Sequence, residues 1–157
     1  MLNEDYKEML QCLAAEHVEF LLVGAYALAA HGYPRATMDI DFWIQPSPDN
    51  ATAVLRAIRR FGAPLHGLSV ADLQKDDTVF QIGVAPRRID ILTGASGLRF
   101  ETAFLNSIPI EIEGLLVRIP SIVDLIRNKR ASGRTKDLAD AEALEDLMTS
   151  RPDAPPR

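Results

Sequence analysis

The amino-acid sequence predicts an α+β fold in which helices flank a small mixed or antiparallel sheet and further helices follow at the C-terminal end. Two observations support this prediction. Segments with helical periodicity and segments with strand character follow one another in irregular order, unlike the repeated strand–helix–strand units of a parallel sheet. A chain of 157 residues is also long enough for one core around a sheet but too short for two. We therefore expect a single domain over residues 1–150.

The first half of the chain is expected to alternate between helix and strand. The expected elements are a helix over 4–16, a strand over 18–23, a helix over 25–30, a strand over 38–44 and a helix from about 50 to 60. The first helix carries apolar Met9, Leu10 and Leu13 at helical spacing, and the first strand is a continuous apolar run. The second helix should stop at His31-Gly32, because glycine can take the left-handed conformation that closes a helix and Pro34 prevents its resumption.

The second half is expected to contain two strands, a hairpin and two helices. The expected segments are strands over 78–84 and 88–92, a hairpin over 108–119, a helix that opens at Ser121 and a last helix that starts near Thr135. The hairpin turns at Glu113-Gly114, and Ser121 followed by Asp124 resembles a capping box. Gly133 separates the two helices. The Pro-rich tail, residues 151–157, cannot continue a helix and is predicted to be mobile.

Composition excludes several classes of protein. Hydrophobic residues make up 47% of the chain and charged residues 25%, which is typical of a globular protein and neither of a disordered chain nor of a membrane protein. The N-terminal residues lack the features of a secretory signal, so we expect a cytoplasmic location with no membrane segment. With a single cysteine, Cys12, neither an internal disulfide nor a zinc site is expected.

The charge balance argues against broad DNA binding and allows a local anionic ligand. The net charge is −5, whereas non-specific nucleic-acid affinity rests on basic residues. Positive charge is nevertheless concentrated locally, most densely between Arg127 and Lys136.

The strand over 38–44 carries the first candidate site. Its alternation places Asp39, Asp41 and Trp43 on the face opposite to Ile40 and Phe42. Two carboxylates at this spacing, with Cα atoms roughly 7 Å apart, suit the paired Mg²⁺ ions of phosphoryl transfer. Taken alone, an Asp-x-Asp pair more often marks strand-end or strand-edge acids that face solvent.

The residues before this strand are consistent with a phosphate-binding turn. An apolar strand ends at Gly24, and a short helix starts at once with Ala25, so backbone amides can approach an anion closely. Arg35 can reach anionic oxygens, and Thr37 shares the acidic face if the strand extends back to it. The alternatives are a surface ion pair for Arg35 and an ordinary strand-to-helix turn for Gly24.

Taken together, these motifs resemble the signature of the polymerase-beta-like nucleotidyltransferase superfamily, and within it the AbiEii/AbiGii-type toxins and related small bacterial nucleotidyltransferases. The matching residues are Leu22-Val23-Gly24-Ala25-Tyr26-Ala27-Leu28, His31-Gly32, Arg35, Thr37 and Asp39-Ile40-Asp41. The resemblance implies a palm-like sheet, nucleotide binding at the glycine turn and metal binding by the aspartate pair. Many members have glycine or serine where this chain has Ala25, so a hydroxyl contact is missing while the backbone amides remain.

Asp90 is the candidate third carboxylate that the resemblance implies. It lies on the strand over 88–92 between inward-facing Ile89 and Ile91, so its side chain should face the same way as the acidic pair if the strands are neighbours. It would serve as a metal ligand and as the base for the attacking hydroxyl. An ion pair with Arg87 or Arg88 is the alternative.

The segment Lys129-Arg130-Ala131-Ser132-Gly133-Arg134-Thr135-Lys136-Asp137-Leu138-Ala139-Asp140 also resembles that branch of the superfamily. We expect Lys129 and Lys136 to contact nucleotide phosphates beside the three aspartates. A purely structural interpretation is that Thr135 caps the helix and that Lys136 pairs with Asp140 four residues on.

The expected function is transfer of a nucleoside monophosphate from an NTP, such as ATP, to a hydroxyl acceptor, supported by two Mg²⁺ ions. The acceptor implied by the resemblance is an RNA end, a protein or a small molecule, and the chain is a candidate toxin with an antitoxin partner. The alternative is a non-catalytic nucleotide-binding or protein-interaction module with the same fold. Haloacid-dehalogenase-like phosphatases also use Asp-x-Asp, but Trp43 stands where they carry Thr or Val. Sugar-nucleotide glycosyltransferases use it too, but their domains are usually longer than this chain.

Overall fold

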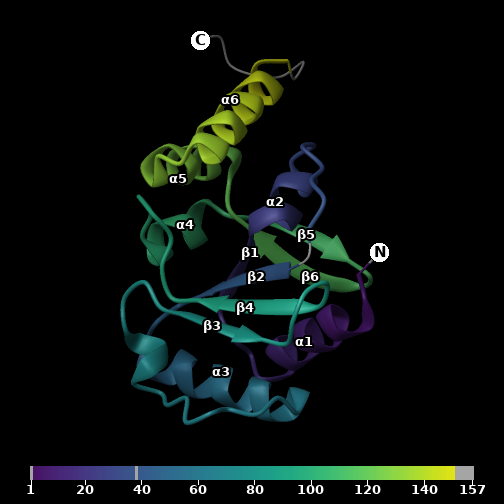
Figure 1. The fold of residues 1–157 in the computed structure, drawn as a ribbon, viewed down its shortest axis with the longest axis vertical. Helices are drawn as coiled ribbons and strands as arrows, with labels where there is room; N and C mark the ends of the chain where they lie inside the picture. Colours follow the sequence, from purple (N-terminus) through teal and green to yellow (C-terminus); the bar gives the residue numbers. More distant parts are fainter. Residues whose placement is uncertain (1, 38, 151–157) are drawn as a thin grey trace.

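The computed structural model describes residues 2–37 and 39–150 and confirms the α+β fold class. Figure 1 shows a central sheet with helices on both sides of it. The elements are α1 (Glu4–Ala15), β1 (Phe20–Val23), α2 (Gly24–Ala30), β2 (Asp39–Ile44), α3 (Pro48–Phe61), η1 (Asp72–Gln74), β3 (Val79–Ile82), β4 (Arg88–Leu92), α4 (Phe100–Asn106), β5 (Ile108–Ile112), β6 (Leu115–Ile119), α5 (Ile122–Ser132) and α6 (Thr135–Ser150). The predicted mobile tail, residues 151–157, lies outside the described residues.

The main sheet is mixed, with strand order β1-β2-β4-β3. Strand β2 pairs antiparallel with β1 and parallel with β4, and β3 closes the other edge antiparallel to β4. Strands β5 and β6 form a separate antiparallel hairpin, and β6 lies against β1. The parallel pair in the middle of the sheet places the two acidic strands side by side.

One face of the sheet packs on α1 and α3, which lie together below it in Figure 1. Alternation along β2 sends Ile40, Phe42 and Ile44 into this core, and all three are fully buried. Helix α3 begins at Pro48 because the hydroxyl of Ser47 accepts a hydrogen bond from the Asn50 amide. The apolar face of α3 then packs against one face of the sheet. The other face of the sheet is left free for polar side chains.

The opposite face has a small apolar cluster under α4, a helix that sequence analysis did not identify. Leu21 and Trp43 face each other across β1 and β2, and Phe100 and Ala103 of α4 cover them. The Trp43 and Phe100 rings meet edge to face at 5.3 Å. Helix α4 has only seven residues, and no side chain caps its N-terminus, so it lacks the usual sequence signal of a helix start.

The C-terminal helices α5 and α6 pack on each other beyond this face (Figure 1). The Ser121 hydroxyl accepts a hydrogen bond from the Asp124 amide, and Gly133 in the left-handed conformation (φ +70°) ends α5 as expected. Within residues 2–37 and 39–150, every helix is too short or too polar to cross a membrane. The packing of α5 on α6 brings the basic segment after Arg127 toward the acidic face of the sheet.

Candidate functional site

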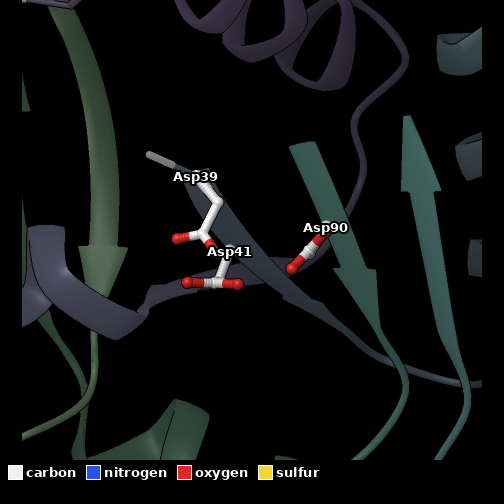
Figure 2. A group of neighbouring side chains, drawn as sticks. All are labelled: Asp39, Asp41 and Asp90. Atoms are coloured by element: carbon white, nitrogen blue, oxygen red, sulfur yellow. The ribbon is translucent and has the colours of Figure 1, made fainter. Parts of the chain in front are cut away.

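Strand pairing gathers the three predicted aspartates on one face of the sheet. The parallel register of β2 and β4 aligns Asp41 with Asp90 and Asp39 with Arg88. One carboxylate oxygen from each aspartate lies within 4.8 Å of the others. Figure 2 shows the carboxylates converging, two from β2 and one from the neighbouring β4. The oxygens are therefore close enough to bind the same cations.

Burial and the repulsion between neighbouring carboxylates disfavour ionisation of Asp41 and Asp90, because little positive charge lies nearby. Asp90 is 5% exposed, while Asp39 and Asp41 are partly exposed. Burial, followed by the charges of Asp39 and Asp90, raises the pKa of Asp41 to about 7. Burial also raises the pKa of Asp90 against the opposing effect of Arg88. A bound cation would favour the ionised forms of Asp41 and Asp90.

Arg88 provides part of the missing charge. One of its guanidinium nitrogens donates to Asp39 Oδ2 at 2.6 Å and to Asp90 Oδ2 at 3.3 Å. Its Nε lies 3.2 Å from Asp90 Oδ1. The ion pair considered as the alternative role of Asp90 is thus present, and it coexists with the three-carboxylate cluster. Sequence analysis named Arg88 only as a possible partner of Asp90. Its position two residues before Asp90, on the same strand face, also indicates a place at the site.

Gly24 packs directly against the carboxylate of Asp41. Its backbone has φ +69°, a left-handed conformation that other residues rarely adopt. A Cβ atom at this position would collide with Oδ2 of Asp41. The absence of a side chain at the start of α2 therefore leaves the space that the Asp41 carboxylate occupies. This adds a packing role to the phosphate and turn roles that the sequence suggests.

A cavity of about 370 Å³ opens in front of the acids. Asp39 and Asp41 line it, while Asp90 lies beside Asp41 behind the lining. The lining also contains every residue that the sequence proposed as a nucleotide contact, namely Gly24, Ala25, Arg35, Thr37, Lys129 and Lys136. The structure thus brings the N-terminal and C-terminal motifs to one space. Thr37 is held by its hydroxyl, which donates to the Asp39 carbonyl at 2.6 Å.

The C-terminal cations differ in how much of their charge is already neutralised. Lys129 lies 3.3 Å from Asp137 and 3.4 Å from Asp140, both of which are buried. Arg35 also pairs with Asp140. The alternative pair between Lys136 and Asp140 does not form, because Asp140 faces inward toward Arg35 and Lys129. Lys136 is exposed and has no ion-pair partner in the described part of the chain.

Asp137 is the centre of this C-terminal network. Burial raises its pKa, but hydrogen bonds from Ser132 and Arg134 and the charge of Lys129 outweigh burial and lower the pKa to about 2. Sequence analysis assigned Asp137 only a favourable position in the first turn of a helix. Its partners lie at the end of α5 and in the turn before α6, so they meet only when the two helices pack.

Comparison with known proteins supports the fold. No family model and no curated protein match the chain. A solved structure from Thermotoga maritima, described as "a putative nucleotidyltransferase (TM1012)", matches with 16% sequence identity and a TM-score of 0.57. The match covers 96% of this chain and 97% of that one. The similarity extends over nearly the whole of both chains, and we conclude that this chain has a nucleotidyltransferase-like fold.

Proposed function

We propose that this protein is a magnesium-dependent nucleotidyltransferase that transfers a nucleoside monophosphate from an NTP to a hydroxyl acceptor. The observation that carries the proposal is the convergence of Asp39, Asp41 and Asp90 beside a cavity whose wall also carries Arg35 and lysines of the C-terminal helices. Carboxylates that hold metal ions next to cations that hold phosphates are the arrangement that phosphoryl transfer requires.

The three carboxylates fit Mg²⁺. Carboxylate oxygens are the ligands that this hard cation prefers, and paired metal ions lie about 3.5–4 Å apart in phosphoryl-transfer sites. The spread of ligand oxygens, within 4.8 Å of one another, is compatible with that spacing. When bound, the ions would supply charge neutralisation at the triphosphate and activation of the acceptor oxygen.

The three aspartates would have separate roles in the reaction. Asp39 and Asp41 orient the reacting groups. The acceptor oxygen forms a bond to the α-phosphorus while the bond from that phosphorus to the β-phosphate oxygen breaks, and pyrophosphate leaves. Asp90 takes the proton of the attacking hydroxyl. This assignment rests on the place of Asp90 in the carboxylate cluster, where one of its oxygens lies within 4.8 Å of an oxygen of Asp39 and of Asp41.

The phosphates of the NTP would lie toward the C-terminal helices. Lys136 lines the cavity and has no ion-pair partner among the described residues, and Lys129 and Arg35 add charge that Asp137 and Asp140 partly balance. The backbone at Gly24 and Ala25 offers amides to the same region. Thr37 supports the loop through its bond to the Asp39 backbone.

The direct experiment is incubation of the protein with labelled NTPs, Mg²⁺, and total cellular RNA or protein or a panel of small hydroxyl compounds. We expect Mg²⁺-dependent labelling of one acceptor class. The variant with Asp39→Asn and Asp41→Asn should lose the labelling and remain folded, because both side chains face away from the main core. Undiminished transfer by this double variant would refute the proposal.

The Arg88 contacts favour one second candidate, a non-catalytic nucleotide-binding or protein-interaction module. In such a module the guanidinium would permanently replace the metal at Asp39 and Asp90. Binding of NTP without any Mg²⁺ requirement, and with no labelled product from any acceptor, would support this alternative.

The sequence resemblance supports a biological extension of the proposal, in which the protein is a cytoplasmic toxin with a cognate antitoxin. Induced expression should then arrest growth, and the Asp39→Asn, Asp41→Asn variant should not. Arrest by both forms would separate toxicity from nucleotide transfer.

A further inference from the structure

Asp140 is a buried carboxylate in the wall of the candidate cavity, and the function proposed above gives it no role other than balancing charge. Its side chain, on α6, is 2% exposed. It lies among the cations assigned to the NTP phosphates, where an acid repels a triphosphate if only its charge is considered. The presence of an acid at this position therefore needs a physical explanation.

Asp140 faces two of these cations, and they come from distant parts of the chain. It forms an ion pair with Arg35, which is 105 residues away in the sequence, and its Oδ2 lies 3.4 Å from the Lys129 ammonium nitrogen. Arg35 belongs to the loop between α2 and β2, which extends toward α6 in Figure 1. A buried ion pair is screened by salt much less than an exposed one. The contact therefore holds the loop before the first acidic strand against the last helix.

Tyr33 holds the Arg35 guanidinium on a second side. The guanidinium carbon lies 5.7 Å from the centre of the Tyr33 ring, within the range of a cation–π contact. The Tyr33 backbone amide donates to the Leu28 carbonyl at 2.9 Å, which fixes this residue to α2. Arg35 donates to Asp140 through one of its terminal nitrogens and to no other acceptor among the described residues. Its remaining N–H groups are therefore available to a ligand in the cavity that it lines.

Two opposing effects decide what Asp140 does to an anionic ligand. Toward the C-terminal helices the cavity lining carries four cations against two carboxylates, namely Arg35, Lys129, Arg134 and Lys136 against Asp137 and Asp140. The wall therefore attracts a triphosphate even with Asp140 ionised. An arginine held in position before binding also loses less conformational entropy when its planar fork meets phosphate oxygens. The loss of this positioning can outweigh the removal of one repulsive charge.

We infer that Asp140 is a positioning residue, which holds the Arg35 guanidinium toward the cavity through a buried ion pair and so strengthens the binding of a polyanion. The inference rests on the proposed function, because the polyanion is the triphosphate of the NTP. Tyr33 supports the same guanidinium from the other side. A distinctive consequence follows. Removing this negative charge from the cavity wall weakens the binding of a polyanion, which is the opposite of what charge alone predicts.

Calorimetric titration of the full-length protein with ATP and with adenosine tests the sign of the effect. In Asp140→Asn we expect ATP to bind about tenfold more weakly and adenosine, which has no phosphates, to bind as in the wild type. The matched control is Asp124→Asn. Asp124 is also buried, at 3% exposed, and its partner Arg127 is 3.7 Å away, but neither residue lines the cavity. ATP binding to this control should be normal.

A double-mutant cycle with Arg35→Met tests whether Asp140 acts through Arg35. If it does, adding Asp140→Asn to Arg35→Met should change ATP affinity by less than about twofold, because no guanidinium is left to position. Asp140→Glu, which keeps the charge, should recover part of the affinity lost in Asp140→Asn. Effects of the two substitutions that simply multiply would overturn the inference, as would equal weakening of ATP binding in the Asp124→Asn control.

NMR of the wild-type protein gives a measurement that does not depend on the folding of Asp140→Asn. The ion pair restricts rotation of the Arg35 guanidinium, so its terminal N–H signals, assigned by comparison with Arg35→Lys, should be resolved with and without ATP. The exposed Arg59 provides the averaged reference signals. Averaged signals for Arg35 would overturn the inference.

The same titrations separate this inference from the proposed function. A wild-type protein that binds no ATP would remove the proposed function, and with it the role of Asp140. Nucleotide transfer by the wild type, together with ATP binding by Asp140→Asn that is as tight as or tighter than that of the wild type, would overturn the role of Asp140 alone.

Discussion

Replacing Lys129 and Lys136 one at a time by Met should separate structural charge from nucleotide-binding charge. The Lys129 side chain is 15% exposed and lies between Asp137 and Asp140, which are 3% and 2% exposed. Removing one partner of a buried ion pair costs about 3–5 kcal/mol. Because Arg134 and Arg35 still face the two aspartates, we expect Lys129→Met to cost about 2 kcal/mol, or roughly 4–8 °C in Tm.

Lys136→Met should change NTP binding and leave thermal stability nearly unaltered. Lys136 is exposed and unpaired in the described part of the chain, so the change should alter stability by less than about 0.5 kcal/mol. If its ammonium group meets the triphosphate, a charge-assisted contact of about 1.5–3 kcal/mol is lost, which weakens NTP binding roughly 10- to 100-fold. The nucleoside, which lacks phosphates, should bind as before.

Thermal unfolding and calorimetric titration with ATP and adenosine measure both effects. An unchanged Tm for Lys129→Met would show that the buried network is not a source of stability. Equal weakening for ATP and adenosine in Lys136→Met would indicate lost shape and not lost charge. Unchanged ATP binding would leave Lys136 with no role at the site.

Three further outcomes are expected. Gly24→Ala should cost about 1–2 kcal/mol for its left-handed backbone and should also displace the Asp41 carboxylate, so thermal stabilisation by Mg²⁺ should fall; in Gly114→Ala, where no atom lies within 4 Å, only the backbone cost should appear. Asp90→Asn should lower kcat by about 100-fold or more with little change in NTP affinity, and a normal kcat would reduce Asp90 to a partner of Arg88. The pKa of Asp137 is about 2 in the folded protein, which is lower than in the unfolded chain. Asp137 should therefore add about 2 kcal/mol to the free energy of unfolding above pH ~4, and this contribution should be lost as the pH falls toward ~2. Urea unfolding should therefore show the stability gap between the wild type and Asp137→Asn narrowing at acid pH, and a constant gap would contradict this assignment.

The local sequence was sufficient to predict the two acidic strands. Alternation along a strand is strict, so the sequence alone places Asp39 and Asp41 on one face and Ile40 and Phe42 on the other. The same rule predicts that Asp90 faces away from Ile89 and Ile91, and strand β4 has the bounds that its sequence predicted. Glycine and proline also marked the ends of α2 and α5 correctly, because their backbone restrictions are local.

Other features depend on which elements meet, and no local pattern contains that information. Only the parallel register of β2 with β4 brings Asp90 and Arg88 next to the acidic pair. Similarly, helical spacing suggested a Lys136–Asp140 pair, while the packing of α5 on α6 turned Asp140 toward Arg35 and Lys129.

The sequence by itself determined which side chains share a face, where most elements begin and end, and which residues are suited to hold metal and phosphate, because strand alternation, helix capping and turn chemistry act over a few residues. The tertiary structure alone decided that these residues surround one cavity, that Arg88 contacts Asp39 as well as Asp90, that Asp137 joins a charged network, and that a second acidic cavity opens beside Trp43. Those outcomes depend on contacts between segments distant in the chain, where register, burial and charge balance are set jointly by the whole fold.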